Sequence, residues 1–446
     1  MTGLRKYMHD HFSSFRTIIV TFMMLILLGA ILLSLPISSV SGQYTNFMDA
    51  LFTSSSAACV TGLVIVDTSS YWSLFGQIII LILIQIGGLG VITIAITTLI
   101  FTGKRIGIME RSTLQDAISA PQIGGVVKLT RFIFVGTMTL EAIGAFFLSL
   151  VFIKDYGFIK GIGYAIFHSI SAFCNAGFDL MGISESGSSL MNYVDSPIIS
   201  VVIPLLIIVG GLGFFTWRDI IDAKFKFKPL RLQSKIILTT TLVLIIVPFI
   251  YFYFVEFKDV DMKTRLCASF FQSVTPRTAG FSTVDYSKMS ETGLIISILL
   301  MLVGGAPGST AGGIKVTSLF VLIVFTMSYI KQKDTVDCFN RRVEEKAIEN
   351  ALAVLILYLI LLLGGMLAIA SIESMPLLPV LFECASALGT VGLSTGITSS
   401  LSVFSKIILM SFMWFGRLGI LTIAYAALSA KSKVIAKHPS EKIIIG

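Results

Sequence analysis

A short residue pattern recurs four times along this 446-residue chain. It consists of Phe, a polar residue, two small or apolar residues, Ser or Thr, and then Ala or Pro, with a glycine four or five residues later. The copies begin at Phe52, Phe167, Phe271 and Phe382, and they lead to Gly62, Gly177, Gly280 and Gly392. The glycines are 115, 103 and 112 residues apart, and this near-constant spacing indicates four internal repeats.

Each copy lies between two long apolar runs. The runs before the copies are about 17–36, 130–153, 236–255 and 347–370, and the runs after them are about 74–101, 197–217, 293–327 and 404–428. Apolar segments of about 20 residues are typical of membrane-spanning helices. Only 13% of the residues are charged and the mean hydropathy is +0.91, whereas a soluble domain is about one quarter charged. The chain is therefore predicted to be a polytopic α-helical membrane protein and not a soluble enzyme.

The repeated pattern, with its roughly 10 to 14 residues, is too short to cross about 30 Å of hydrocarbon as a helix. It predicts a re-entrant pore helix followed by an extended loop. The expected fold is all-α and potassium-channel-like, with four repeats of span, pore helix, filter loop and span around a central ion pore, and with eight full spans. The expected divisions are 1–16 (N-terminus), 17–103, 104–217, 218–330 and 331–430 (repeats 1 to 4) and 431–446 (C-terminus).

Most Lys and Arg residues gather in a few places. These are the N-terminus, 104–131, 218–235, 331–346 and the C-terminus from Lys431. The positive-inside rule places these segments, and hence both termini, in the cytoplasm. No zinc-finger or aromatic-interleaved spacing accompanies the basic residues, which argues against a nucleic-acid partner.

The four glycine-containing stretches are predicted to form an ion filter. Backbone without helical hydrogen bonds survives at membrane depth only inside protein or against water. A ring of carbonyl oxygens can replace the hydration shell of a cation, and glycine allows the close backbone approach that this requires. The filter residues are Val60, Thr61, Gly62 and Leu63; Asn175, Ala176, Gly177 and Phe178; Thr278, Ala279, Gly280 and Phe281; and Thr390, Val391, Gly392 and Leu393. The alternative for any single stretch is a tight turn between helices.

Three acidic residues follow the filter glycines, namely Asp67, Asp179 and Asp285. An anionic rim at a pore entrance would concentrate cations there. The alternative is that they are ordinary solvated loop residues.

Two ionisable residues lie inside the predicted pore helices. His168 and Glu383 occupy equivalent early positions, where the other two copies have Thr53 and Gln272. A metal site or an acid–base pair is one interpretation. Their equivalence in the repeats favours polar anchors that tie the half-helices to their neighbours, and no catalytic residue is expected.

A glycine cluster follows each filter glycine by 24 to 33 residues. Such clusters often permit close helix packing in membranes. In the third repeat the run from Gly293 to Ile323 is too long for one span, and its middle cannot hold a straight helix. We expect an intramembrane loop beside the pore, formed by Gly304, Gly305, Ala306, Pro307, Gly308, Ser309, Thr310, Ala311, Gly312 and Gly313 and followed by Lys315.

Arg417 stands where the first two repeats have Gly88 and Gly211. An arginine inside a membrane is costly and marks a functional site by default. Pointing inward, it would raise a barrier to cations and donate to free carbonyls of the loop, so that loop and arginine together form a gate. Snorkelling to the interface is the alternative, but apolar sequence extends on both sides of Arg417.

With these motifs, the chain resembles the Trk/Ktr/HKT superfamily of cation transporters, and it is most like the KtrB/KtrD membrane subunits of bacterial Ktr systems. The resemblance covers about 17–430. It rests on the four filter stretches, with Arg277 before Thr278 and Gly389 before Thr390, and on Gly-Ser-Thr-Ala-Gly-Gly-Ile-Lys at 308–315. It implies potassium as the main ion because all four filter glycines are present, whereas sodium-selective plant relatives have a serine at the first.

The resemblance also implies properties that the residues alone do not. Loop 304–313 and Arg417 match the family's gate, and sodium would stimulate transport or permeate with potassium. No covalent cofactor is implied. Family members are homodimers in the bacterial cell membrane, with one pore per subunit, on a cytosolic ring of nucleotide-binding (RCK/KTN-type) regulatory subunits. The basic segments 104–131, 218–235 and 331–346 are candidate contacts for that ring, although anionic lipid would attract them equally.

Three rival interpretations stay open. A sodium–potassium symporter or a sodium-permeable transporter could share the same fold. A secondary transporter with alternating access usually shows two repeats, whereas four are present here. An intramembrane enzyme would need convergent ionisable groups, and His168, Glu383 and Arg417 are scattered across the repeats.

Overall fold

The computed structural model describes residues 14–91, 93–95, 97, 115, 125–182 and 189–427. The predictions for the C-terminus, for nearly all of the N-terminus and for most of the basic segment 104–131 lie outside these residues. Within them nearly all of the regular secondary structure is helical.

Each quarter of the chain begins with one long apolar helix. These helices are α2 (Ser14–Ser34), α8 (Val126–Tyr156), α12 (Leu232–Tyr251) and α16 (Glu345–Glu373). A π-helical turn, η3 (Phe252–Glu256), extends α12. All four are long and apolar enough to cross a membrane. They coincide with the four apolar runs that precede the repeated pattern.

The repeated pattern itself forms a shorter helix in every quarter. These pore helices are α3 (Phe47–Ala58), α9 (Phe158–Phe173), α13 (Met262–Val274) and α17 (Leu377–Gly389). With 12 to 16 residues each, they rise about 18 to 24 Å, less than the hydrocarbon thickness. They are the core of the molecule, and every residue of α17 from Phe382 to Gly389 is buried.

The second apolar run of every quarter is broken, although the sequence predicts a break only in the third. The pieces are α5 (Leu74–Leu89), followed by further helical residues; α10 (Pro197–Gly211) and α11 (Phe214–Asp222); α14 (Glu291–Leu302) and α15 (Val316–Ile330); and α18 (Val403–Leu418) and α19 (Ile420–Ala427). Gly90, Gly213 and Gly419 form three of the breaks with φ of 88°, 85° and 84°, a conformation that favours glycine. The bend between α10 and α11 is 91°. The sequence predicts one broken span where the structure has four, because these glycines end helices as well as pack them.

Short elements complete the described chain. They are the single turns η1 (Pro36–Ser38), α4 (Thr68–Tyr71), η2 (Met191–Tyr193), η4 (Tyr286–Lys288) and η5 (Thr398–Ser400), and a hairpin of β1 (Asp337–Cys338) and β2 (Arg341–Arg342). The antiparallel hairpin pairs Asp337 with Arg342 and Cys338 with Arg341. It lies in the basic segment 331–346, and the sequence does not predict it.

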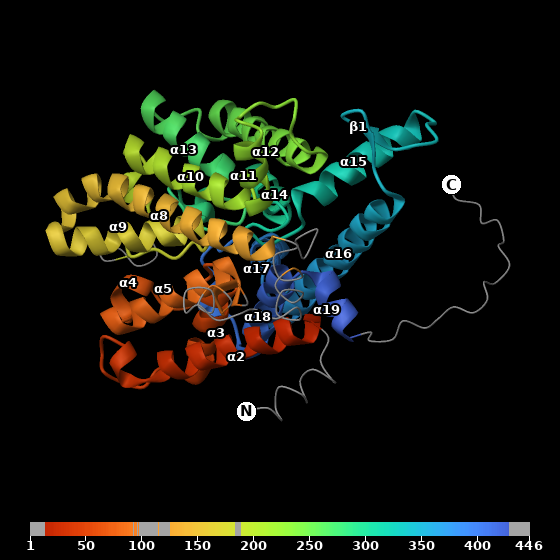
Figure 1. The fold of residues 1–446 in the computed structure, drawn as a ribbon. Helices are drawn as coiled ribbons and strands as arrows, with labels where there is room; N and C mark the ends of the chain where they lie inside the picture. The colour runs from red at the N-terminus through yellow and green to blue at the C-terminus, as the bar shows by residue number, and fades with distance from the viewer. Residues whose placement is uncertain are drawn as a thin grey trace.

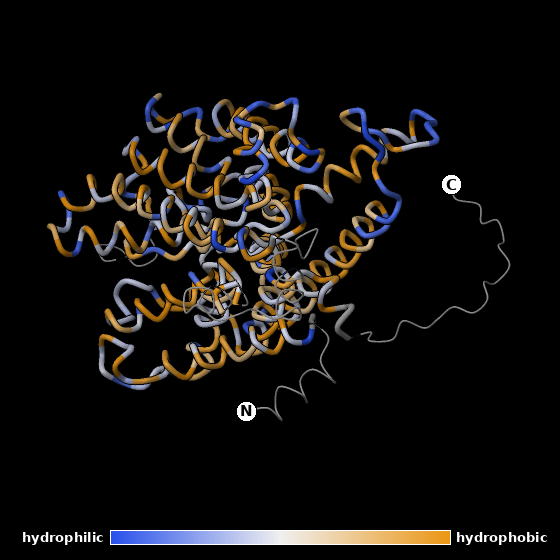
Figure 2. Tube along the Cα trace, viewed as in Figure 1, coloured by the Kyte–Doolittle hydropathy of each residue, from blue (hydrophilic) through white to orange (hydrophobic). Residues whose placement is uncertain are grey.

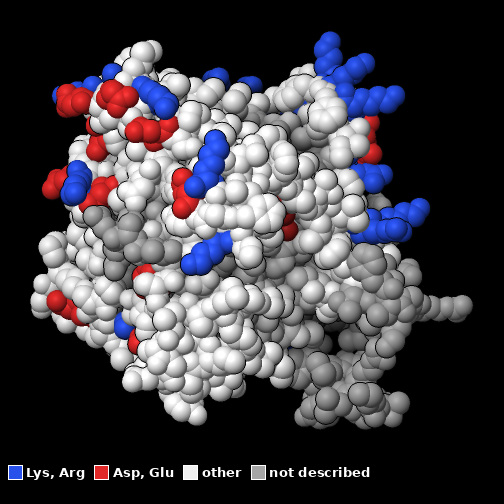
Figure 3. Space-filling model, turned by 90° about the vertical axis from the view of Figure 1, so that its left-hand side faces the viewer, with Lys and Arg blue, Asp and Glu red and all other residues white. Residues whose placement is uncertain are grey.

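The outer surface is apolar, as a lipid-facing surface must be. Helix α2 exposes Met24 (64%), Leu28 (57%) and Ile31 (55%) and buries Ala30 and Leu33 completely. Figure 2 shows hydrophobic residues along the helices, with hydrophilic residues mainly in the connections. Figure 3 shows a broad area of the surface without charged residues. These features agree with a multi-pass membrane protein.

The four quarters pack around a common centre (Figure 1). The colours pass from the red first quarter through yellow and green to the blue fourth, and the fourth quarter closes against the first, since α18 contacts α3 and α19 contacts α2. The beginning of α2 and helix α19 lie at the same end of the molecule.

Candidate functional site

The four pattern glycines form a closed ring at this centre. A Cβ atom added to any of them would collide with a main-chain oxygen of the next quarter. The pairs are Gly62 with Ala176, Gly177 with Ala279, Gly280 with Val391 and Gly392 with Thr61. The contacts run in one direction and return to the start, so the ring has the connectivity of a fourfold axis. Any side chain at these positions would push the quarters apart.

The same unusual backbone is built four times. The residue two positions before each glycine has a left-handed φ, of 58° at Val60, 59° at Asn175, 64° at Thr278 and 52° at Thr390. The glycines also have positive φ, between 70° and 96°. A β-branched residue in this region is strained, and three of these four residues are β-branched. Such strain clusters at functional sites, where the surrounding structure holds it in place.

Hydroxyl groups from the pore helices fix these turns. The Oγ atoms of Ser56 and Ser386 each accept a hydrogen bond of 3.0 Å from the N–H of their own quarter's glycine. In the other two quarters, Ser171 donates to the main-chain oxygen of Phe178 and Thr275 to that of Phe281. These are the Ser and Thr residues of the repeated pattern. The sequence therefore contained the signal, but the tethering role is visible only in the structure.

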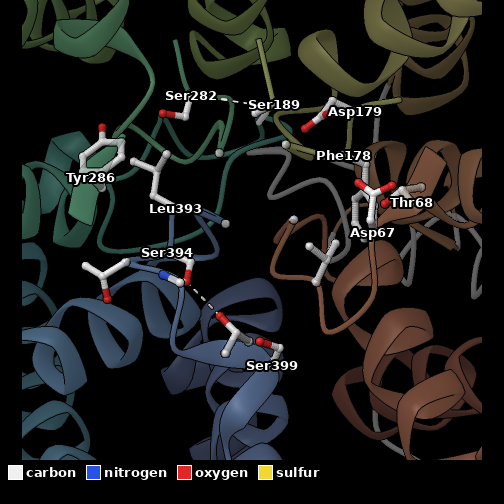
Figure 4. Close-up of a pocket in the computed structure, with 18 of the residues that line it drawn as sticks. Asp67, Thr68, Phe178, Asp179, Ser189, Ser282, Tyr286, Leu393, Ser394 and Ser399 are labelled. Carbon is white, nitrogen blue, oxygen red and sulfur yellow. Dashed lines mark hydrogen bonds between the residues drawn. The ribbon is translucent and has the colours of Figure 1, made fainter. Parts of the chain in front are cut away.

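A cavity of 560 Å³ leads to the ring. All four glycines line it, and so do Asp67, Asp179 and Asp285. Figure 4 shows segments from the four quarters around this space, with Asp67 and Asp179 close together on one side. The structure thus brings together the predicted filter glycines and the predicted acidic rim.

The three aspartates are held by local hydrogen bonds as well. Asp67 accepts from the N–H of Ser70 at 2.9 Å, and Asp285 accepts from the N–H of Ser287 at the same distance. Hydrogen bonds from Ser287 hold the pKa of Asp285 below its usual value. Burial raises the pKa of Asp179 to about 6, and the nearby charge of Asp67 contributes in the same direction. Both of these carboxyl groups therefore carry most of their negative charge at neutral pH.

The polar residues early in the pore helices bind the segment that follows the filter in their own quarter. His168 Nε2 accepts from the N–H of Leu180 at 3.3 Å, and Gln272 Nε2 donates to Thr283 Oγ1 at 3.4 Å.

Glu383 accepts three hydrogen bonds in the same way, from the Ser394 hydroxyl, from Thr398 Oγ1 at 3.0 Å and from the N–H of Thr395 at 3.2 Å. Thr53 differs, because its hydroxyl bonds within α3, to Asp49. Three of these four pore-helix residues are therefore anchors. They bind a segment of their own quarter, whereas the sequence predicts that they bind neighbouring elements.

The predicted loop 304–313 is a hydrogen-bonded segment that contacts the broken second span of the second quarter and the fourth filter turn. The N–H of Ala306 donates to the oxygen of Gly211 at 2.8 Å, and the N–H of Phe214 donates back to the oxygen of Gly308 at 2.9 Å. Thr310 Oγ1 lies 3.1 Å from the oxygen of Phe173, at the end of the second pore helix. A Cβ on Gly312 would collide with the Thr390 side chain of the fourth turn.

Two cationic side chains bind consecutive oxygens of this loop. The Arg417 guanidinium donates to the main-chain oxygens of Thr310, Gly87 and Gly88. Lys315 Nζ donates to the oxygens of Ala311 at 2.8 Å and Gly312 at 3.2 Å. Arg417 therefore connects the loop of the third quarter to the broken second span of the first, and it points inward instead of toward the interface.

The ring offers a particular set of donors. Among the described residues there is no group of three His, Cys, Asp or Glu side chains that could hold a metal. The ring instead presents main-chain oxygens, which are hard ligands and can replace the water around an alkali cation. The cavity that reaches the ring is lined by aspartates, and the side chains of Lys315 and Arg417 donate to main-chain oxygens of loop 304–313.

Comparison with known proteins agrees with this architecture. The family model described as "TrkH: Cation transport protein" matches residues 4–436. The chain is 39% identical to the "Potassium/sodium uptake protein NtpJ" of Enterococcus hirae over 100% of both chains, and 38% identical to the "Ktr system potassium uptake protein B" of Bacillus subtilis over 95% of both.

The fold resembles that of the crystal structure of the potassium transporter TrkH from Vibrio parahaemolyticus, with a TM-score of 0.73 at 20% identity, covering 95% of this chain and 86% of that one. The predicted fold class and the predicted superfamily are confirmed. The chain belongs to the TrkH family of cation transport proteins, which are membrane transporters and not enzymes.

Proposed function

We propose that this protein takes up K⁺ across the bacterial cell membrane through a pore along the axis of the glycine ring. The observation that carries the proposal is the closed ring itself, in which each glycine faces a main-chain oxygen of the next quarter. The names of the two relatives above both state potassium uptake. We also propose that the four repeats meet at 103/104, 217/218 and 330/331.

The selectivity filter consists of 60–63, 175–178, 278–281 and 390–393. Dehydrated K⁺ is coordinated there by backbone carbonyls, which the Ser and Thr tethers hold at fixed spacing. The aspartates of the outer cavity raise the local cation concentration. The strain at the left-handed residues maintains a geometry that an unstrained turn would not adopt.

Loop 304–313, Lys315 and Arg417 form the gate. In the closed state of this gate the loop obstructs the cytoplasmic side of the filter, and the hydrogen bonds from Lys315 and Arg417 to its oxygens support this role. A permeating cation is repelled by both charges at this level. Opening requires Thr310 of the loop to leave its partners Phe173, Asn175 and Arg417, and a hydrogen-bonded glycine-rich segment can do this without disturbing the packed spans.

The protein works as a homodimer with one pore per subunit and with both termini in the cytoplasm. The name of the relative from Bacillus subtilis places that relative in a Ktr system, and this supports a multi-component assembly for the present protein. The partner we propose is a cytosolic ring of nucleotide-binding RCK/KTN-type subunits. The basic segments, including the hairpin in 331–346, are its contact surface.

Sodium is the second candidate ion. The relative from Enterococcus hirae is named a potassium/sodium uptake protein, and it aligns with the whole of this chain. A sodium–potassium symporter or sodium-permeable transporter would use the same ring of oxygens.

Complementation of a potassium-uptake-deficient bacterium at low potassium tests the proposal. Wild type should restore growth, and Gly62→Ser should abolish the rescue or shift it toward a sodium leak, because a side chain at this position collides with Ala176. Gly42→Ser is the matched control, since Gly42 also has positive φ but has no atom within 4 Å of an added Cβ. Failure of wild type to rescue, or equal behaviour of both variants, would contradict the proposal.

A further inference from the structure

Arg277 is a buried cation without an acidic partner in the described part of the chain. The residue is 6% exposed, and its Nε atom has no hydrogen-bond partner. One terminal nitrogen donates to Thr241 Oγ1 of α12 at 3.4 Å. Buried arginines are normally paired, because an unpaired charge in a low-dielectric interior is costly. The cost of burying this unpaired charge therefore requires an explanation.

The local fold does not require an arginine at this position. Arg277 lies three residues before a filter glycine, and the equivalent residues of the other quarters are Cys59, Cys174 and Gly389. The residue that follows has nearly the same left-handed φ in all four quarters, between 52° and 64°. Three small residues thus support the same turn, so the turn does not require an arginine.

The position of Arg277 links its charge to the filter. Its main-chain oxygen lies 3.4 Å from Asn175 Nδ2, which belongs to the filter stretch of the second quarter. Gly280 is three residues away, so the two Cα atoms are at most about 11 Å apart. The side chain contacts α12, behind the third filter stretch, and does not reach the ring oxygens through any hydrogen bond that the described residues make.

We propose that Arg277 is a specificity-determining residue that excludes divalent cations from the filter. This inference rests on the proposed transport of K⁺. The unpaired positive charge repels every cation in the ring, but it repels a divalent cation twice as strongly. The carbonyl oxygens attract both kinds of cation, but the charge of Arg277 subtracts twice as much from the binding of a divalent cation as from that of K⁺.

The size of the effect follows from Coulomb's law. At a separation on the order of 10 Å and an effective dielectric constant of about 20, the additional repulsion of a divalent ion is roughly tenfold in binding. Ba²⁺ is the suitable probe, because its ionic radius is close to that of K⁺. Removing the charge should therefore make Ba²⁺ a stronger inhibitor while leaving the oxygen ring in place.

The test is inhibition of Rb⁺ uptake by Ba²⁺ in proteoliposomes. Arg277→Gln and Arg277→Met remove the charge, and Arg277→Lys keeps it. Both neutral variants should lower the half-inhibitory Ba²⁺ concentration by about tenfold, and the lysine variant should stay within about twofold of wild type. Lys154→Gln is the control, since Lys154 is exposed near the end of α8 and lies outside the basic segments, and it should not change the inhibition.

Unchanged Ba²⁺ sensitivity in a neutral variant that still transports Rb⁺ would overturn the proposal, and so would equal changes in the lysine and neutral variants, which would indicate a purely structural role. If either neutral variant fails to fold, the other serves. If both fail while the lysine variant folds and transports, the positive charge is needed for folding and the proposal is also overturned. Absence of Rb⁺ uptake by wild type would instead contradict the proposed function, so the two failures are distinguishable.

Discussion

The guanidinium of Arg417 binds the main-chain oxygen of Thr310, two residues that are 107 positions apart in the chain. One side chain of the fourth quarter thereby holds the intramembrane loop of the third. The same guanidinium binds Gly88 at 2.8 Å in the first quarter, so three quarters meet at a single charged group.

Replacement of Arg417 by alanine should open the pore. The change removes the hydrogen bonds to Thr310, Gly87 and Gly88 and also the charge that repels cations. Hydrogen bonds to a charged group contribute about 1.5 to 3 kcal/mol each, so we expect Rb⁺ uptake into proteoliposomes to rise at least about tenfold. The exposed Lys154 near the end of α8, replaced by glutamine, is the control. Unchanged uptake in Arg417→Ala would exclude this residue from the gate.

Thr310→Val tests the loop from its other side. The hydroxyl of Thr310 lies 3.1 Å from the oxygen of Phe173 and 3.2 Å from Asn175 Oδ1, and valine has the same shape without these contacts. Because one such bond contributes about 1 kcal/mol, uptake should increase up to about fivefold. Thr326→Val removes a hydroxyl that bonds only within α15 and should leave uptake unchanged. A decrease in Thr310→Val would mean that the hydroxyl favours the conducting state.

Asp179 should make uptake depend on external pH. Burial raises the pKa of its carboxyl group to about 6, so the group is charged at pH 7.5 and mostly neutral at pH 5. We expect the KM for Rb⁺ to increase as the pH falls through 6, because the outer cavity loses a negative charge. Asp179→Asn should show, at both pH values, the higher KM that wild type shows at pH 5.

Asp285 provides the contrast for this experiment. Hydrogen bonds from Ser287 keep the pKa of Asp285 below its usual value, so this group stays charged over the same range. Asp285→Asn should raise the KM at pH 7.5 and retain the pH dependence. If Asp179→Asn keeps the wild-type pH profile, another group is responsible.

Glu383→Gln should destabilise the segment behind the fourth filter stretch. The carboxylate accepts hydrogen bonds from Ser394, Thr395 and Thr398, and a glutamine amide would present N–H groups to some of these donors. Leaving buried donors unsatisfied costs about 1 to 3 kcal/mol, so the apparent melting temperature of the purified protein should fall. Glu349→Gln, at an exposed position of α16, should not change it. An unchanged melting temperature would show that Glu383 is not an anchor.

Much of the fold could be predicted because two simple signals were strong. Apolar runs long enough to span a membrane predicted the long helix that begins each quarter, and the spacing of the glycines predicted the four repeats. The ring around Gly62 could be expected for the same reason, since four equivalent copies in one chain must meet at an axis. The loop at 304–313 was predictable because glycine and proline cannot continue a helix.

Other features could not be predicted from local sequence. The breaks at Gly90, Gly213 and Gly419 depend on a positive φ, which a glycine permits but does not require. The hydrogen bonds of Arg417 join residues from three quarters, so they depend on tertiary packing. The missing partner of Arg277 could be recognised only when the surroundings of its side chain were known.

Anomalous diffraction from crystals grown with Rb⁺ tests the proposed filter most directly. We expect a Rb⁺ peak on the axis of the ring, coordinated by the main-chain oxygens of Thr61, Ala176, Ala279 and Val391, and we expect it to be absent in Gly62→Ser. A ring without Rb⁺, with the ion bound only elsewhere in the protein, would contradict the proposal that these oxygens select the transported cation.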